Sequence, residues 1–304
     1  MRNCLVIALL VSLWGCGKSV KVDAPAMDEP DRVLYEKALN LMAKHNYALA
    51  QVTLQTFIST YQDSDYFPKA KYALAESYYR EGGREGLDSA EAAFKDYIIY
   101  FRDSDLADDA QMMVAMTHVR RVQSADRDNT EARLAELELK EMIAAYPNSD
   151  LLEEAKQKLR EVVEILAEGS FNIAHQYYMR KNYKASVDRL KEIEEKYPDF
   201  SKMAETLYFH AESLRQANNA EASGSLYSEV VADFPGSPKA KLAKQRLIEL
   251  NMPVPEPNPL AVPRPVQQSD KNLLGKTVGV FKSHPTVPLS TSAASVAEVK
   301  EKKN

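Results

Sequence analysis

A short phrase that recurs five times constrains the fold of this chain more than any other feature. In each copy an aromatic residue is followed by polar or proline residues, and the aromatic residues lie 40, 45, 51 and 37 positions apart. A period of this length is typical of stacked helical repeats. The five phrases begin at Tyr61, Phe101, Tyr146, Tyr197 and Phe234.

An amphipathic segment precedes every phrase. A small residue comes first, and large apolar residues follow it at offsets of four and seven. These offsets place all three residues on one face of a helix. The five sets are Ala50, Leu54 and Phe57; Ala90, Phe94 and Tyr97; Ala135, Leu139 and Met142; Ser186, Leu190 and Ile193; and Ser223, Tyr227 and Val230.

A second helix is predicted upstream of each segment, and it also carries a small residue in every copy. A glycine-rich run at 82–86 is expected to lengthen the turn of the second pair, and residues 150–179 are expected to form one long helix shared by the third and fourth pairs. Short side chains at facing positions let paired helices approach closely. The small residues are Ala38, Ala75, Ala115, Ala174 and Ala211.

The pattern resembles the tetratricopeptide repeat, in which two antiparallel helices alternate over about 34 residues. It predicts an all-α solenoid of about five helix pairs over residues 31–250, with a capping helix at 237–250. Such arrays are curved scaffolds and seldom enzymes.

Composition excludes several functions. The net charge of −5 gives no overall cationic field for nucleic acid. The two cysteines, Cys4 and Cys16, both lie in the first sixteen residues, so the rest of the chain holds no disulfide and no cysteine nucleophile. The five histidines are scattered, and no metal-binding, nucleotide-binding or hydrolase motif is present. We therefore expect no enzymatic activity, no metal and no cofactor other than a covalent lipid.

The N-terminus reads as an export signal for a lipoprotein. Residues 1–15 contain a basic residue and an apolar stretch too short to span a bilayer. The run that ends at Cys16 resembles a lipoprotein cleavage site, which predicts acylation of Cys16 by chains such as palmitate and a polar leash at 16–30. The alternative is an ordinary signal peptide with a chance cysteine.

The C-terminal region, residues 251–304, changes character. It holds eight of the fifteen prolines and one aromatic residue, Phe281. Such a segment buries too little apolar surface to offset its ordering entropy, which predicts a disordered tail. One patch, 273–281, is the candidate to order on a partner; its function is left open.

The inner face of the first three pairs is the first candidate site. Counted from each first-helix alanine, the residues three before, one after and four after are expected to point into a groove that accepts an extended peptide. The alternative is that they pack between neighbouring repeats. The apolar and aromatic members are Tyr35, Leu39, Tyr72, Tyr79, Met112 and Met116.

The last pairs are richer in charge. Basic and acidic residues alternate between 180 and 196, and Arg189 and Arg215 are candidates to bind carboxylates of a docked protein. The alternative is an ordinary solvated helix face.

More specific runs resemble the BamD family, lipoproteins of the outer-membrane β-barrel assembly machine. These runs are 126–128, 130–133, 146–149, 171–183 and 186–190. The long insert before the fourth pair also fits that family, whereas the proline-rich tail is longer than is usual in it.

The resemblance implies a non-enzymatic role. N-terminal repeats of the family bind C-terminal targeting signals of unfolded outer-membrane proteins, and C-terminal repeats dock on POTRA domains of the barrel protein BamA and on accessory lipoproteins. Carried over, the signal-reading end holds Tyr35, Tyr72, Tyr78 and Tyr79, and the docking end holds Arg180 and Arg189.

The resemblance also implies a lipid-anchored location on the periplasmic face of the outer membrane, without nucleic-acid contacts. One alternative is another repeat-scaffold lipoprotein, for pilus assembly or cell-division coordination. A peptidoglycan hydrolase is the second, although no reactive constellation supports it.

Overall fold

A computed structural model of the chain describes residues 29–122, 125 and 128–259. Within these residues it contains eleven α-helices and no strand, which confirms the predicted all-α fold. The predicted signal peptide, Cys16 and residues 260–304 of the tail lie outside the described residues. The helices are α1 (Pro30–Ala43), α2 (Tyr47–Thr60), α3 (Phe67–Glu81), α4 (Gly83–Tyr100), α5 (Ala107–Arg121), α6 (Thr130–Ala145), α7 (Leu152–Met179), α8 (Tyr183–Lys196), α9 (Met203–Gln216), α10 (Ala220–Asp233) and α11 (Pro238–Glu249).

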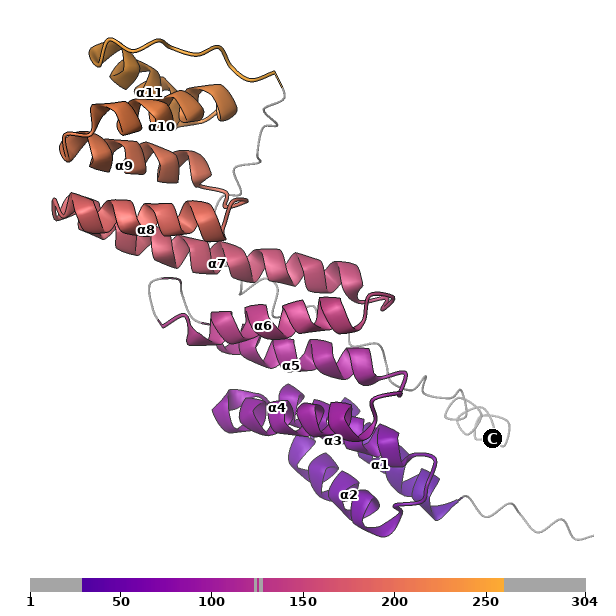
Figure 1. The fold of residues 1–304 in the computed structure, drawn as a ribbon. Coiled ribbons are helices and arrows are strands. Elements are labelled where there is room, and N and C mark those ends of the chain that lie inside the picture. Colours follow the sequence, from indigo (N-terminus) through magenta and orange to yellow (C-terminus); the bar gives the residue numbers. More distant parts are fainter. Residues whose placement is uncertain (1–28, 123–124, 126–127, 260–304) are drawn as a thin grey trace, which may run out of the picture.

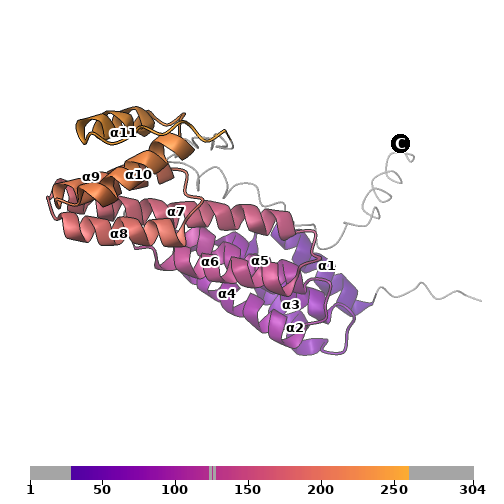
Figure 2. The same ribbon diagram turned by 45° about the horizontal axis from the view of Figure 1, so that its top comes forward.

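The helices form an elongated stack in which each helix packs on the next one along the chain (Figure 1). Consecutive helices pair as α1/α2, α3/α4, α5/α6, α7/α8 and α9/α10, and α11 covers the end by contacting both α9 and α10. The turned view shows the same progression from α1 to α11 (Figure 2). None of the helices in the described part of the chain is both long and apolar enough to cross a membrane.

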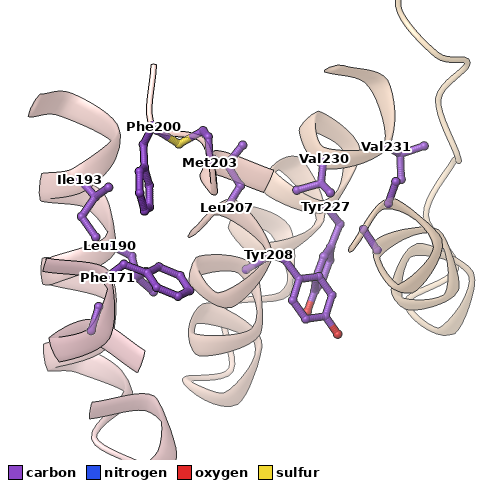
Figure 3. Packing of buried hydrophobic residues seen from close by; sticks show 14 of the residues in the cluster. Phe171, Leu190, Ile193, Phe200, Met203, Leu207, Tyr208, Tyr227, Val230 and Val231 are labelled. Atoms are coloured by element: carbon purple, nitrogen blue, oxygen red, sulfur yellow. The ribbon is translucent and has the colours of Figure 1, made fainter. Parts of the chain in front are cut away.

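The repeating positions that the sequence singles out all lie in the core. All five first-helix alanines and all fifteen second-helix positions are buried. In the last pairs, Leu190 and Ile193 of α8 face Phe171 of α7, while Tyr227 and Val230 of α10 meet α9 (Figure 3). Burying one such large side chain contributes about 1.5–3 kcal/mol, so these positions hold the pairs together.

The recurring phrase ends one helix and begins the next. The backbone N–H of Phe101 donates to the carbonyl of Tyr97 at 2.8 Å and closes α4. The backbone N–H of Ser104 then donates to the Phe101 carbonyl at 3.0 Å. The Ser104 hydroxyl accepts the backbone N–H of Leu106 at 3.2 Å, just before α5. The serine therefore satisfies a backbone donor that no helix carbonyl reaches.

The glycine-rich run differs from the prediction. Only Gly82 lies in the turn, with a φ of 75°, and α4 already begins at Gly83. The extra residues lengthen the helix to 18 residues rather than lengthening the turn. The positive φ favours glycine at this position, and a Cβ there would also displace the Arg120 guanidinium, which would lie 2.7 Å away.

The long shared helix is confirmed. Helix α7 runs for 28 residues, and its first half packs with α5 and α6 while its second half packs with α8 and α9. Gly169 lies near its middle, where a Cβ would meet the Asn129 side chain at 2.6 Å and the Ala125 carbonyl at 2.7 Å. Ala125 and Asn129, which lie between α5 and α6, therefore pack directly on this helix.

Residues 251–259 form an ordered segment, here called the C-terminal strap, although disorder was predicted from residue 251. Met252 and Val254 pack on the last core, and the backbone N–H of Asn258 donates to the Ala232 carbonyl at 2.8 Å. The prediction was wrong for these nine residues because their few apolar side chains fit the free side of α10. The strap is the last described part of the ribbon in Figure 1.

Candidate protein-docking site

Four of the residues predicted to line an open groove are inside the core. Tyr35, Tyr72, Met112 and Met116 are each at most 2% exposed, so an incoming peptide cannot reach them. The prediction of a groove lined by these four side chains is wrong. They pack between helices instead, as the alternative interpretation held.

The reason is helical geometry. A residue three positions before an alanine lies on the same helix face as that alanine, and this face points at the partner helix. The ring of Tyr35 accordingly lies 6.1 Å from that of Phe57, centroid to centroid. The ring of Tyr72 lies 5.4 Å from Phe94 and 5.6 Å from Tyr97. Burial raises the pKa of the Tyr72 hydroxyl well above its ordinary value.

The other three predicted groove residues, Leu39, Tyr78 and Tyr79, are half-buried. The Tyr78 hydroxyl accepts a hydrogen bond from the Gln55 amide at 2.9 Å. The Arg120 guanidinium lies over the Tyr79 ring at 5.1 Å and donates to the Tyr79 carbonyl at 2.6 Å. Burial raises the pKa of the Tyr79 hydroxyl. These side chains are held in place by neighbours and offer only part of their surface.

A recess at the loop edge of the N-terminal half offers more exposed aromatic surface. It has a volume of about 510 Å³ and lies where α3, the end of α4 and the start of α5 meet. Tyr100 and Phe101 line it, and Tyr100 is 73% exposed. The repeat pattern does not mark Tyr100, because this residue lies in the last turn of α4, outside the repeating core positions.

A second cleft lies between the third and fourth pairs and contains Arg189. Its volume is about 720 Å³. Helices α6 and α8 each contribute an arginine, a glutamate and a lysine at offsets of 0, 3 and 7, which share one helix face. We call this the basic cleft. These residues are Arg133, Glu136 and Lys140 from α6, and Arg189, Glu192 and Lys196 from α8.

Tyr197, Ser170 and Ile173 form the less charged part of the basic cleft. Ile173 is about half-exposed on the side of α7. Burial raises the pKa of the Tyr197 hydroxyl, and the nearby Glu136 carboxylate adds to the increase. Apolar side chains next to arginines are a combination that is typical of surfaces that bind another protein.

The charges of the basic cleft are only partly paired. Four cations face two carboxylates, which leaves a net charge of +2. Lys140 contacts Glu136 at 2.6 Å, and Glu192 accepts from both Arg189 at 3.1 Å and Lys196 at 2.5 Å. Arg133 has no carboxylate partner among the described residues. Exposed pairs of this kind contribute about 0–1 kcal/mol each, so exchanging one for a partner's carboxylate costs little.

Hydrogen bonds shift the pKa values of the paired Glu192 and Lys196 side chains. The hydrogen bond from the Lys196 ammonium lowers the pKa of the Glu192 carboxyl, and the Arg189 guanidinium adds to the decrease, while burial opposes it. Glu192 in turn raises the pKa of Lys196. Both shifts favour the ionised forms of Glu192 and Lys196 at neutral pH.

The structure does not bring the three predicted docking arginines together. Arg180 is exposed at the C-terminal end of α7 and does not line the basic cleft. Arg215 lies on α9 and pairs with Glu212 at 2.9 Å. The sequence analysis did not single out Arg133, Lys140 or Lys196 as a group with Arg189, although the same spacing at 133 and 189 was available as a signal. No group of three possible metal ligands is found in the described ranges.

Fold and clefts together define a tetratricopeptide-like repeat scaffold with two surface clefts. The sequence matches the family described as outer membrane lipoprotein, YfiO, over residues 27–224. The chain belongs to this family, and the resemblance to BamD is confirmed.

Relatives named outer membrane protein assembly factor BamD support the assignment. The chain is 25% identical over 220 residues to that of Vibrio cholerae, which covers 69% of this chain and 89% of the relative. It is 26% identical over 203 residues to that of Xylella fastidiosa, with coverage of 64% and 68%. It is 22% identical over 246 residues to that of Neisseria gonorrhoeae, with coverage of 77% and 91%.

Among solved structures, the TPR2AB domain of yeast Sti1 in its pHSP90 complex aligns with 73% of this chain and 84% of its own. The TM-score is 0.38 and the identity is 10%.

Proposed function

We propose that this protein is a non-enzymatic assembly factor for outer-membrane proteins. The family match and the named relatives support the role. A stack of paired helices without its own chemistry works by holding other polypeptides at fixed places. In this proposal the chain is a scaffold lipoprotein of the β-barrel assembly machine.

The basic cleft is the observation that carries the docking step. In our proposal a POTRA domain of a BamA-type barrel protein places carboxylates against Arg189 and the unpaired Arg133. A guanidinium can bind a carboxylate through two parallel hydrogen bonds, which fixes orientation as well as affinity. Arg180 and Arg215 lie outside the basic cleft and would contribute at most through accessory lipoproteins.

The N-terminal pairs take the unfolded substrate in this proposal. The recess beside Tyr100 and the half-buried Leu39, Tyr78 and Tyr79 offer accessible apolar surface at that end. Targeting signals that alternate apolar and aromatic residues would insert one aromatic side chain into the recess. Recognition of this kind requires no ATP.

Membrane attachment would come from acyl chains on Cys16, with residues 16–30 as the leash and the repeats on the periplasmic face of the outer membrane. Each buried methylene adds about 0.8 kcal/mol, so two or more chains anchor stably. A Cys16→Ala variant should move from the membrane fraction to the soluble fraction on salt-washed fractionation. A variant that remains tightly attached would contradict the lipid anchor.

Arg189→Glu tests the docking step. Affinity purification from detergent-solubilised membranes should bring down a large barrel protein with POTRA domains, and the variant should recover several-fold less of it. Lys191→Glu is the matched control, since it makes the same charge change two residues away on an exposed part of α8.

Equal recovery with Arg189→Glu and Lys191→Glu would remove the basic cleft from docking. Recovery of pilus or division proteins without a barrel protein would favour the alternative function, another repeat-scaffold lipoprotein of the cell envelope.

A further inference from the structure

A third surface lies on the last pairs, away from the basic cleft. It is formed by α7, α9 and α11, the first helices of successive pairs, and α9 contacts both of the other two. His175 and Tyr178 of α7 and Phe209 of α9 are half-buried there, and Lys239 reaches in from α11. We call this the aromatic face. The proposed function uses none of these four residues.

The rings of the aromatic face pack against one another. The His175 and Phe209 ring centroids lie 4.7 Å apart at an interplanar angle of 72°, and Tyr178 lies 5.2 Å from Phe209 at 63°. Edge-to-face contacts at these distances fix ring orientation and contribute about 0.5–1.5 kcal/mol beyond area burial. The face is therefore a preorganised platform, and little conformational freedom remains to be lost on binding.

Cations surround this platform. The Lys239 ammonium lies 4.8 Å from the Phe209 ring centroid and 5.2 Å from that of Tyr208. It forms no ion pair with a carboxylate in the described part of the chain. Arg215 and Arg246 are close enough to Tyr178 to lower the pKa of its hydroxyl, although burial and Glu212 raise it overall.

Two acidic groups of this region, Glu212 and Glu249, are already paired with arginines. Glu212 is buried at 2% exposure, and Arg246, Tyr227 and Arg215 all donate to it. Glu249 pairs with Arg246 at 2.7 Å. What remains accessible is aromatic surface together with an unpaired ammonium.

We propose that the aromatic face is a second peptide-binding site, whose ligand is an extended acidic segment that carries aromatic residues. A ligand carboxylate would pair with Lys239, and a ligand ring would stack beside Phe209 and Tyr178. Charge complementarity selects this ligand over the chain's own tail, since residues 260–304 hold seven basic and three acidic residues.

Fluorescence anisotropy with two labelled heptapeptides tests the proposal. The first alternates Asp or Glu with Phe or Tyr, and the second replaces each acid by Lys. The first peptide should bind the full chain saturably, and the second should bind at least tenfold more weakly. Absence of saturable binding of the first peptide, or equal binding of both, would overturn the proposal.

A pair of charge reversals locates the site. Lys239→Glu should weaken binding of the acidic peptide at least tenfold, because it removes the one unpaired cation over the rings. Lys241→Glu makes the same charge change on the same helix, about 200° around its axis, and should alter binding less than twofold. Lys241 is exposed, and circular dichroism should show both variants folded. If both variants weaken binding of the acidic peptide equally, the overall charge of the protein explains the effect, and the proposal is overturned.

A chain truncated after Pro259 tests whether the chain's own tail, rather than an external peptide, occupies the aromatic face. If an external segment is the ligand, this truncation should bind the acidic peptide with unchanged affinity. A gain of tenfold or more would show that the chain's own tail covers the aromatic face, and the external ligand would be excluded. None of these outcomes depends on Arg189, so failure here leaves the proposed docking function separately testable.

Discussion

The N-terminal and C-terminal pairs share one frame but place their aromatic side chains differently. In α1 and α3, Tyr35 and Tyr72 are buried against the second helix of their own pair, whereas Tyr100 at the end of α4 is exposed. In α7–α9 the rings of Tyr178 and Phe209 lie at the rim with cations nearby. The same repeat frame thus carries aromatic side chains both in the core and on accessible surfaces.

The difference teaches that the helix face, rather than the residue type, decides whether an aromatic side chain is available. Tyr72 is three residues before Ala75 and shares its inward face. Phe209 is two residues before Ala211, which rotates it by about 200° away from that face. A tyrosine in a first helix is therefore no evidence of a binding groove until its offset is known.

The largest expected effect is the loss of unfolding free energy when a buried aromatic ring of the N-terminal pairs is removed. Tyr72→Ala removes a ring that packs on Phe94 and Tyr97, and truncating a buried aromatic residue costs about 3–5 kcal/mol of unfolding free energy. Tyr100→Ala removes an exposed ring of the recess and should cost less than about 0.5 kcal/mol. Urea unfolding followed by circular dichroism measures both. Similar losses in the two variants would refute the division into buried and accessible rings.

A smaller effect is expected at the other end. Glu212→Gln keeps the shape of the side chain but removes the charge that Arg215 and Arg246 share, at a cost of about 2–3 kcal/mol for charged hydrogen bonds at a buried site. Glu249→Gln, on the same Arg246, is exposed and should cost less than about 0.5 kcal/mol. The same urea unfolding compares them. A loss with Glu249→Gln as large as with Glu212→Gln would show that burial does not govern this network.

The same carboxylate predicts a pH dependence. Burial by itself raises the pKa of Glu212, but hydrogen bonds from Arg215, Tyr227 and Arg246 more than offset it and hold the pKa below its ordinary value of 4.5. The unfolded chain then binds more protons there, so the Glu212 contribution is present above about pH 4.5 and is lost as the pH falls through the lower native pKa. The gap between wild type and Glu212→Gln in urea unfolding should shrink over that range. A constant gap would contradict the assignment.

The smallest effect concerns the C-terminal strap. A Cβ at Gly224 would lie 2.0 Å from the Met252 sulfur, so Gly224→Ala must displace that flexible side chain. The gain in helix propensity, about 1 kcal/mol, offsets the lost packing, and global stability should change by less than about 1 kcal/mol. Limited proteolysis should nevertheless cut residues 251–259 faster. Ser225→Ala, at an exposed position on the same helix, should leave the cleavage rate unchanged.

The periodic sequence predicted the core, since every alanine and every +4 and +7 position that it marked is buried. The long α7 was also predictable, because its apolar pattern runs on without a phrase to end it. The basic cleft was not, because Arg133 and Arg189 are 56 residues apart and meet only through the packing of two pairs. The order of residues 251–259 was missed because composition does not reveal that Met252 fits against Gly224.

Helix α7 has a further consequence for how the two ends work together. A continuous helix of 28 residues is about 42 Å long, and it is built into both adjoining cores. The two halves of the protein therefore share a rigid strut rather than a hinge. A ligand of the first pairs and a ligand of the last pairs are therefore held at a fixed distance and orientation relative to each other.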